Sequence, residues 1–320
     1  MSNTATTAMM FAALLPLVNE IGRERPFTRE LLLGIPGAAS LGGLGTIIGS
    51  PANAIAVDMI NRLPEVDKNI GFLEWMVVGT PLAILLVIIF WYLLTRKHKI
   101  ANDIDFSVLR KSMINDAETG DYLGNWNRQK VMWIVIAVTV LLWLTDGIHP
   151  IPMAAVSGIP IIVLTMMNII GAEDVRSLPW DTLMLVAGGL SLGIAIQETG
   201  LMDYFLSHLE TAALPAFVLI VTFAGISVFA SNVMSNTAAA AILISAASLW
   251  EGVDPIVLPL IIALSAGCAM YLPVSTPPNA IAYSTGLVEP KEFRLGGLSM
   301  GILGPIFITI WVLVVVKLFF

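Results

Sequence analysis

The sequence is poor in charged residues and contains a single cysteine. Only 12% of its 320 residues are Asp, Glu, Lys or Arg, whereas a soluble globular domain carries roughly a quarter. Because Cys268 has no second cysteine to pair with, no disulfide can form within the chain. The histidines, His98, His149 and His208, lie at or outside the ends of apolar runs, and no Asp or Glu lies in the middle of one. An intramembrane enzyme, which needs such groups, is therefore not expected.

Apolar residues are abundant and occur in long blocks. They make up 57% of the chain, and the mean hydropathy is +0.86. Residues 31–57, 75–95, 211–250 and 255–288 contain no charged side chain. A helix needs about 20 apolar residues to cross a bilayer, and a soluble helix would interrupt such runs with a solvated face. The sequence therefore predicts an all-α, polytopic membrane protein.

The boundaries of these blocks predict the order of the segments. Turn residues between them delimit 2–19, 31–60, 75–95, 131–148, 151–171, 181–198, a pair of helices within 213–250, 255–287 and 296–318. An amphipathic stretch at 200–212 predicts a helix in the membrane interface. The polar connector 96–130 is rich in Lys and Arg, which places it in the cytoplasm and the C-terminus outside.

Two pairs of motifs recur in the same order along the chain. Ser2-Asn3-Thr4 returns as Ser235-Asn236-Thr237, and the later motif Pro51-Ala52-Asn53-Ala54-Ile55 returns as Pro277-Pro278-Asn279-Ala280-Ile281. An odd number of expected crossings separates the two copies, so the repeats should be inverted in the membrane. Inverted repeats with interrupted helices are typical of secondary transporters that bind their substrate near the membrane midplane.

The residues around the second motif of each pair should interrupt a helix. Gly43, Gly45 and Gly49 precede Pro51, and Pro273 precedes Pro277; glycine and proline both weaken a helix interior. The carbonyl groups of an unwound segment suit a hard cation such as sodium, and the amides of a helix N-terminus favour an anion. Because the spans contain no Lys or Arg to pair with a dianion, coupled cations are expected.

The turn within 213–250 has two interpretations. Residues 231–237 contain Ser, Asn and Thr but no charge. Such a turn favours a re-entrant hairpin whose tip stays at membrane depth, where irregular backbone survives only if it is buried or lines a cavity. The alternative, two ordinary spans joined by a short loop, leaves the same overall topology.

At these motifs the sequence resembles the divalent anion:sodium symporter family of dicarboxylate and citrate carriers. The resemblance includes both Ser-Asn-Thr motifs, both Pro-x-Asn-Ala-Ile segments and residues 181–200. It implies re-entrant hairpins and broken transmembrane helices, a homodimer when the protein is full length, and an elevator mechanism. Family members carry further spans before the first Ser-Asn-Thr, whereas here the motif starts at Ser2. The chain is therefore expected to be an N-terminally truncated or split form of such a carrier.

The resemblance also implies the site residues. Each motif pair would build one sodium site and half of a shared substrate site. The sodium ligands would come from Ser2, Asn3 and Gly49 in the first repeat, and from Ser231, Met234, Asn236 and Ser275 in the second. The substrate carboxylates would meet Asn3, Thr4, Ser50, Pro51, Asn236, Thr237, Thr276 and Pro277.

The expected function is that of a secondary active transporter in the bacterial inner membrane. It would couple sodium to the uptake of a C4-dicarboxylate or similar divalent anion, with lipid around it, no organic cofactor and no nucleic acid. The alternatives are a sodium-independent dicarboxylate or citrate exchanger, and a non-transporting fragment or subunit of such a carrier. The expected regions are 1–95 and 213–320 as the two halves of a transport domain, 96–130 as a cytoplasmic linker, and 131–212 as scaffold spans with the interfacial helix.

Overall fold

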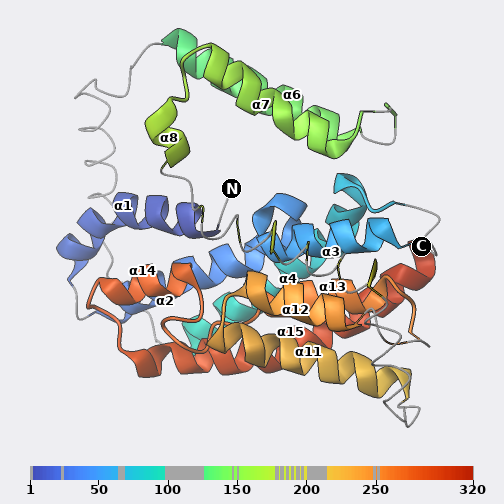
Figure 1. The fold of residues 1–320 in the computed structure, drawn as a ribbon. Coiled ribbons are helices and arrows are strands. Elements are labelled where there is room, and N and C mark those ends of the chain that lie inside the picture. Colours follow the sequence, from blue (N-terminus) through green and yellow to red (C-terminus); the bar gives the residue numbers. More distant parts are fainter. Residues whose placement is uncertain are drawn as a thin grey trace. The chain divides into compact units, whose positions relative to one another are not determined.

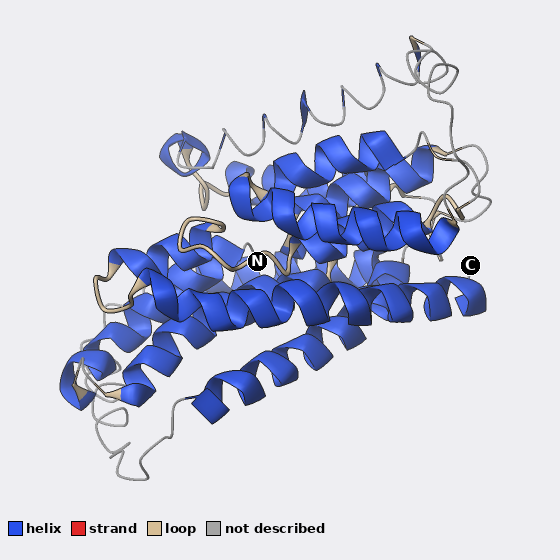
Figure 2. Ribbon diagram, turned by 90° about the horizontal axis from the view of Figure 1, so that it is seen from below, coloured by secondary structure: helices blue, strands red, loops and turns tan. Residues whose placement is uncertain are grey.

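The computed structural model of the chain is helical throughout its described parts. It describes residues 3–22, 25–63, 69–97, 126–145, 148–149, 151–176, 215–247, 250, 253–319 and single positions between 180 and 199. Within these residues every regular element is a helix (Figure 2), which confirms the all-α prediction. The predicted interfacial helix 200–212, and most of the connector 96–130 and of the segment 181–198, lie outside the described residues.

The chain divides into two compact units. The first contains residues 1–70, 75–101 and 182–320, and the second contains 71–74 and 102–181. Both copies of each repeated motif therefore belong to the first unit.

The first repeat consists of one helical arm, one interrupted helix and one long helix (Figure 1). These are α1 (Asn3–Ile21), α2 (Pro26–Gly42), the 3-10 turns η1 (Gly43–Gly45) and η2 (Ile47–Gly49), α3 (Pro51–Arg62) and α4 (Phe72–Lys97). Proline occupies the first helical turn of α2 and of α3, where its missing N–H costs no intrahelical hydrogen bond. The predicted interruption of 31–60 is therefore present at Gly43–Ser50.

The second repeat has the same order of elements. A hairpin of α11 (Ala216–Val233) and α12 (Asn236–Ala247) precedes α13 (Val257–Ala266), α14 (Pro277–Ser284) and α15 (Pro290–Phe319). Residues 267–276 separate α13 from α14 and contain no helix. The second predicted interruption is thus also present.

The second unit is a smaller helical group. It contains α6 (Trp126–Leu144), α7 (Met153–Met166) and the short α8 (Ala172–Arg176), and α6 packs along α7. The rings of Phe72 and Trp143 stack with their centroids 5.2 Å apart.

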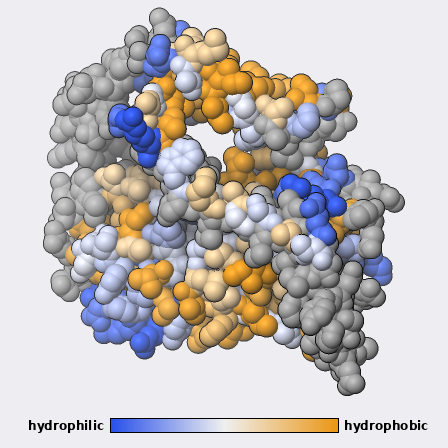
Figure 3. All heavy atoms as spheres, in the orientation of Figure 1, coloured by the Kyte–Doolittle hydropathy of each residue, from blue (hydrophilic) through white to orange (hydrophobic). Residues whose placement is uncertain are grey.

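Large apolar side chains lie exposed along the long helices. On α15, Leu298, Ile302, Ile306 and Ile310 follow one another at helical spacing and are 57%, 54%, 49% and 58% exposed. Figure 3 shows hydrophobic residues across much of the visible face. Water would not tolerate such a continuous stripe on a soluble helix, and among the described helices α4, α11 and α15 are long and apolar enough to span a bilayer. The chain is an integral membrane protein.

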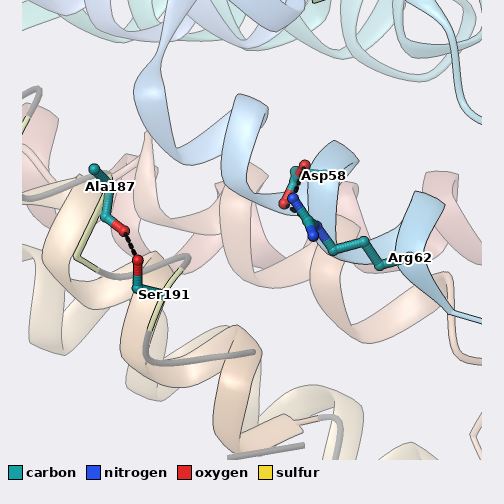
Figure 4. Close-up of polar contacts among 4 residues, drawn as sticks. All are labelled: Asp58, Arg62, Ala187 and Ser191. Atoms are coloured by element: carbon teal, nitrogen blue, oxygen red, sulfur yellow. Dashed lines mark hydrogen bonds and ion pairs between the residues drawn. The ribbon is translucent and has the colours of Figure 1, made fainter. Parts of the chain in front are cut away.

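Hydroxyl groups within the apolar helices find partners in their own helix. The Ser245 hydroxyl donates to the carbonyl of Ala241 at 2.9 Å, and the Ser191 hydroxyl donates to that of Ala187 at 2.8 Å (Figure 4). Such bonds to the preceding turn let a polar side chain sit in an apolar helix without an unpaired donor.

The length of α12 favours the re-entrant hairpin over two ordinary spans. With its 12 residues and about 1.5 Å of rise per residue, α12 is about 18 Å long, short of the roughly 30 Å hydrocarbon core. Met234 and Ser235 alone separate it from α11, and the two helices pack together. A short second helix is what the re-entrant interpretation expects, and the depth of the turn in the membrane stays a prediction.

Each hairpin arm packs against its own repeat and also against the interrupted helix of the other repeat. Arm α1 contacts its own α2 and also α14 of the other repeat; arm α12 contacts its own α13 and also α3. Likewise α2 contacts α14, and α13 contacts α3. Each of these contacts thus has its counterpart in the other repeat, as an internal two-fold relation requires, and the interrupted helices lie together with both hairpin arms.

Candidate functional site

The first interruption is a tight loop that depends on glycine. A Cβ atom on Gly49 would lie 2.2 Å from the carbonyl oxygen of Gly43, so the loop approaches itself too closely for any side chain at this position. The amide of Gly49 donates to the carbonyl of Thr46 at 3.1 Å. Ser50 then adopts an extended conformation before Pro51 starts α3.

Side chains of α4 hold two carbonyl groups of this loop. Trp75, which is fully buried, donates from its indole nitrogen to the carbonyl of Leu44 at 3.0 Å. One turn and a half later, the Thr80 hydroxyl donates to the carbonyl of Gly45 at 3.0 Å. These bonds satisfy backbone groups that the interruption has released from helical pairing.

Asn3 is the point where the first hairpin arm meets the first interruption. With its nitrogen turned toward the loop, its carboxamide donates to the carbonyls of Ala39 at 2.9 Å and Gly49 at 3.1 Å. Gly43 leaves the room for it, since a Cβ there would lie 2.3 Å and 2.7 Å from the two terminal atoms of the Asn3 carboxamide. The structure thus brings together Asn3 and Gly49, two of the three predicted ligands of the first sodium site. Ser2, the third, lies outside the described residues.

The second interruption is closed mainly by its own residues. The Ser275 hydroxyl lies 2.8 Å from the carbonyl oxygen of Leu272 and 3.4 Å from that of Ala269, donating into the loop. Thr276 caps α14, because its hydroxyl oxygen accepts from the amide of Asn279 at 3.3 Å. Ser275 and Thr276 are buried, while Pro277, which follows them, is exposed at the start of α14.

The tip of the second hairpin holds two buried oxygens without a hydrogen-bond partner among the described residues. They are the hydroxyl oxygen of Ser231, a fully buried residue, and the side-chain oxygen of Asn236. Met234, which lies between these two residues, has an extended backbone and ends α11. Thr237, which follows Asn236, is 5% exposed. A buried unpaired polar atom costs about 1–3 kcal/mol, and a cation bound to both oxygens would remove that cost. Both residues are predicted sodium ligands, and their joint ligation of a cation stays a prediction.

The predicted substrate residues lie at the ends of helices from both repeats. Asn3 and Thr4 start α1, which packs on α14, the helix that Pro277 starts. Asn236 and Thr237 start α12, which packs on α3, the helix that follows Ser50. Two pairs of packed helices, α1 with α14 and α3 with α12, thus begin at predicted substrate residues, and helix N-termini favour anions.

The site uses neutral oxygen donors. Among the described residues, no cluster of three or more His, Cys, Asp or Glu side chains could hold a metal. The carboxylate of Asp58 in α3 is instead held by Arg62 one turn later, through bonds of 2.7 Å and 3.1 Å (Figure 4). Neutral oxygens are suitable ligands for a weakly held alkali ion, which must also leave the site.

Sequence reasoning missed several residues that shape this region. Trp75 and Thr80 hold the first interruption, and Asn232 accepts from the amide of Tyr271 at 2.9 Å in the second. Nothing in the local pattern of α4 distinguishes Trp75 from a residue that packs against lipid. Asn53 and Asn279 lie in the repeated motif, and that repetition is a signal that could have marked them as functional.

The chain is similar in sequence to several proteins named as transporters. The chain is 31% identical over 97% of its length to an uncharacterised transporter of Methanocaldococcus jannaschii. It is 28% and 29% identical, again over 97% of its length, to proteins named sodium-dependent dicarboxylate transporter from Staphylococcus saprophyticus and Staphylococcus aureus. The chain spans 69%, 65% and 65% of the lengths of these three proteins, respectively.

A family model described as citrate transporter matches residues 1–250. The match includes the first motif pair and the second hairpin with Asn236, so it covers elements that build the candidate site. The relatives confirm the resemblance that the repeated motifs indicated. The chain belongs to the citrate transporter family.

Proposed function

We propose that the protein is a secondary active transporter that couples sodium to the uptake of C4-dicarboxylates or similar divalent anions. The observation that carries the proposal is the pair of buried, unpaired oxygens of Ser231 and Asn236 at the tip of the second hairpin. They lie in elements that pack against both interrupted helices. A cation held there would bring positive charge to the region where the helix N-termini receive an anion.

Sodium binding in the first repeat would involve a rotation of one amide. In one orientation of its carboxamide, the Asn3 oxygen faces the carbonyl oxygens of Ala39 and Gly49; in the other, its nitrogen donates to both carbonyls and its oxygen points away from them. If the carboxamide turns over, its oxygen joins these carbonyl oxygens in facing one point, the arrangement that a hard cation needs. Two orientations of Asn3 would then correspond to the sodium-free and the sodium-bound site.

The substrate carboxylates would be held by neutral donors. The hydroxyls of Thr237 and Thr276 would donate to them beside the N-terminus of α3. The start of α14 contributes its helix dipole and no amide, because Pro277 and Pro278 have no N–H. Each helix N-terminus carries about half a positive charge, so these termini and the coupled cations together can balance a dianion without a Lys or Arg in contact with it.

The relatives support both the ion and the class of substrate. The two staphylococcal proteins are named for sodium-dependent dicarboxylate transport, while the matching family model is described as a citrate transporter. We therefore place C4-dicarboxylates first and citrate second as substrates to test. A sodium-independent exchanger is the alternative for the same site.

We further propose that transport proceeds by an elevator mechanism in a homodimer, with the C-terminus outside a bacterial plasma membrane. In this scheme 1–95 and 213–320 form the moving domain, 96–130 the linker and 131–212 the scaffold. The division of the chain into two compact units, with both repeats in one of them, supports a separate moving domain. The long exposed apolar helices support the membrane location.

Uptake into proteoliposomes tests the proposed function. Radiolabelled succinate and citrate are offered with an inward sodium gradient, with an equal potassium gradient, and with unlabelled substrate preloaded inside. Sodium-driven accumulation of succinate is the expected result. Uptake that needs internal substrate but no sodium would replace symport with exchange, and no uptake of either anion would overturn the proposal.

A further inference from the structure

Asn53 ties together the ends of the first interruption. It is fully buried, and its carboxamide nitrogen donates to the carbonyls of Gly43 and Thr46, both at 2.9 Å. Its backbone amide also donates to the carbonyl of Ser50 at 3.0 Å. One residue of α3 thus holds the beginning, the middle and the end of the unwound segment.

Asn279 makes the equivalent contacts in the second repeat. It is 2% exposed, and its carboxamide nitrogen donates to the carbonyls of Met270 and Leu272, both at 3.2 Å. Its backbone amide donates to the hydroxyl oxygen of Thr276, the residue before α14. The backbone amide of Asn53 likewise donates to the residue before α3, in that case to the carbonyl of Ser50. In each repeat one of the two bound carbonyls lies seven residues before the asparagine.

The chemistry of these contacts requires a primary amide. An –NH2 group offers two donors at fixed angles, which match two carbonyls of the unwound segment at once. A carboxylate has no donor when ionised and would repel both carbonyl oxygens, and glutamine would place the same group one methylene too far. The repetition of this contact by two segments far apart in the sequence indicates a shared role.

We propose that Asn53 and Asn279 are a pair of positioning residues that hold the two interruptions in the shape needed for ion and substrate binding. The inference rests on the proposed function of the site. Each asparagine forms hydrogen bonds with carbonyls inside its loop. The carbonyl at the end of the loop, that of Gly49 or Ser275, then remains available to bind sodium. Each asparagine also fixes the residue that precedes the next helix, Ser50 or Thr276, where the anion is bound.

Transport kinetics test this role with Asn53→Asp and Asn279→Asp, which keep the size of the side chain. Asn61→Asp is a matched control, because Asn61 lies in the same α3 and also closes a backbone loop, with bonds of 3.0 Å and 2.7 Å to Ile70. We expect the sodium concentration for half-maximal uptake to rise about tenfold or more in the first two variants, the change that loss of one such hydrogen bond produces. The control should lower only the maximal rate or the yield.

Thiol labelling gives a readout that does not depend on transport. In a Cys268→Ser background, Ile47→Cys and Met270→Cys place single thiols at buried positions, 6% and 3% exposed, in the first and second interruption. Asn53→Asp should speed maleimide labelling at position 47 alone, and Asn279→Asp should speed it at position 270 alone. Asn61→Asp should change neither.

The two experiments separate the possible failures. If the parent chain shows no sodium-dependent uptake while labelling responds repeat by repeat, the proposed function falls and the holding role of the asparagines stands. If the parent transports and the aspartate variants keep its sodium dependence, the positioning role is wrong. Labelling rates that are equal in all variants would also overturn it.

Discussion

The two interruptions hold their loops in different ways. In the first, α4 supplies Trp75 and Thr80 to the carbonyls of Leu44 and Gly45, and Asn3 reaches in from α1. In the second, Ser275 bonds within its own loop, and Asn232 of α11 accepts from the backbone of Tyr271. The first loop is therefore bonded by side chains of other helices, α4 and α1. The second loop is bonded largely by its own residues and by α11 of its hairpin.

Among the predicted sodium ligands that the structure describes, the buried oxygens without a partner lie in the second repeat. In the first repeat the buried side-chain oxygen of Asn53, which is not a predicted ligand, also has no partner among the described residues. In the first, the Asn3 nitrogen donates to the carbonyls that a cation would otherwise occupy. In the second, the oxygens of Ser231 and Asn236 are buried and have no partner among the described residues. A cation should therefore gain more from binding to the second repeat, and substitutions there should have the larger effect on sodium use.

The largest effect is expected from Asn236→Ala. The substitution removes a sodium ligand and a substrate donor from the start of α12 together, so dicarboxylate binding should weaken about 100-fold or more, as expected for loss of a charge-assisted contact. Succinate-induced thermal stabilisation, with and without sodium, measures this. Asn61→Ala, in α3 but bonded to Ile70, should keep the parent's succinate response. An unchanged dicarboxylate affinity in the Asn236 variant would refute the assignment of the site.

A smaller, purely ionic effect is expected from Ser231→Ala. Loss of the buried hydroxyl should raise the half-saturating sodium concentration about tenfold, the equivalent of roughly 1.4 kcal/mol, with little change in succinate affinity at saturating sodium. Ser227→Ala is the control, since Ser227 is equally buried one turn earlier but donates to the carbonyl of Ile262 at 2.7 Å. That variant should lose stability and keep its sodium dependence. Equal sodium shifts in both would show that Ser231 acts through packing.

Much of this architecture could be predicted from the sequence because its causes are local. Charge-free runs indicate a membrane, and glycine and proline around positions 43–51 and 273–278 cannot continue a helix. The repetition of Ser-Asn-Thr and Pro-x-Asn-Ala-Ile identified the elements that build the site. The structure places Asn3 beside Gly49, and the role of both as sodium ligands stays a prediction.

Other features could not be read from the sequence because they depend on tertiary contacts. Trp75 looks like any aromatic residue of a span until α4 packs on the first interruption and aims its indole at Leu44. The exchanged packing of α1 on α14 and α12 on α3 also arises only when the repeats assemble. The bonds of Asn53 lie within one segment, but only the path of the unwound backbone brings Gly43 and Thr46 to its side chain.

A moderate effect is expected from Trp75→Phe, which tests whether the first loop depends on α4. Removing the indole N–H leaves the buried carbonyl of Leu44 unpaired, at a cost of about 1–3 kcal/mol in folding free energy. Trp311→Phe is the matched control, because Trp311 donates at 2.9 Å to the carbonyl of Val78 in α4 and not to a carbonyl of the loop. Thermal unfolding in detergent should report a loss in both variants. Stabilisation by sodium should weaken only in the Trp75 variant, and an equal weakening in both would remove the distinction between the two loops.

The smallest effect is expected from Asp58→Asn. Asp58 and Arg62 form an ion pair on the exposed side of α3, with side chains 34% and 47% exposed, and such pairs contribute about 0–1 kcal/mol. Arg62 remains favourable in the last turn of α3 after the substitution, because a cation there complements the helix dipole. Stability, measured at low and high salt, should therefore change little, and sodium-dependent uptake should stay at the level of the parent chain. A large change in sodium affinity would mean that the charge on α3 determines how tightly the first site binds sodium, and that the shape of the loop before α3 does not. The difference between the two repeats would then be electrostatic.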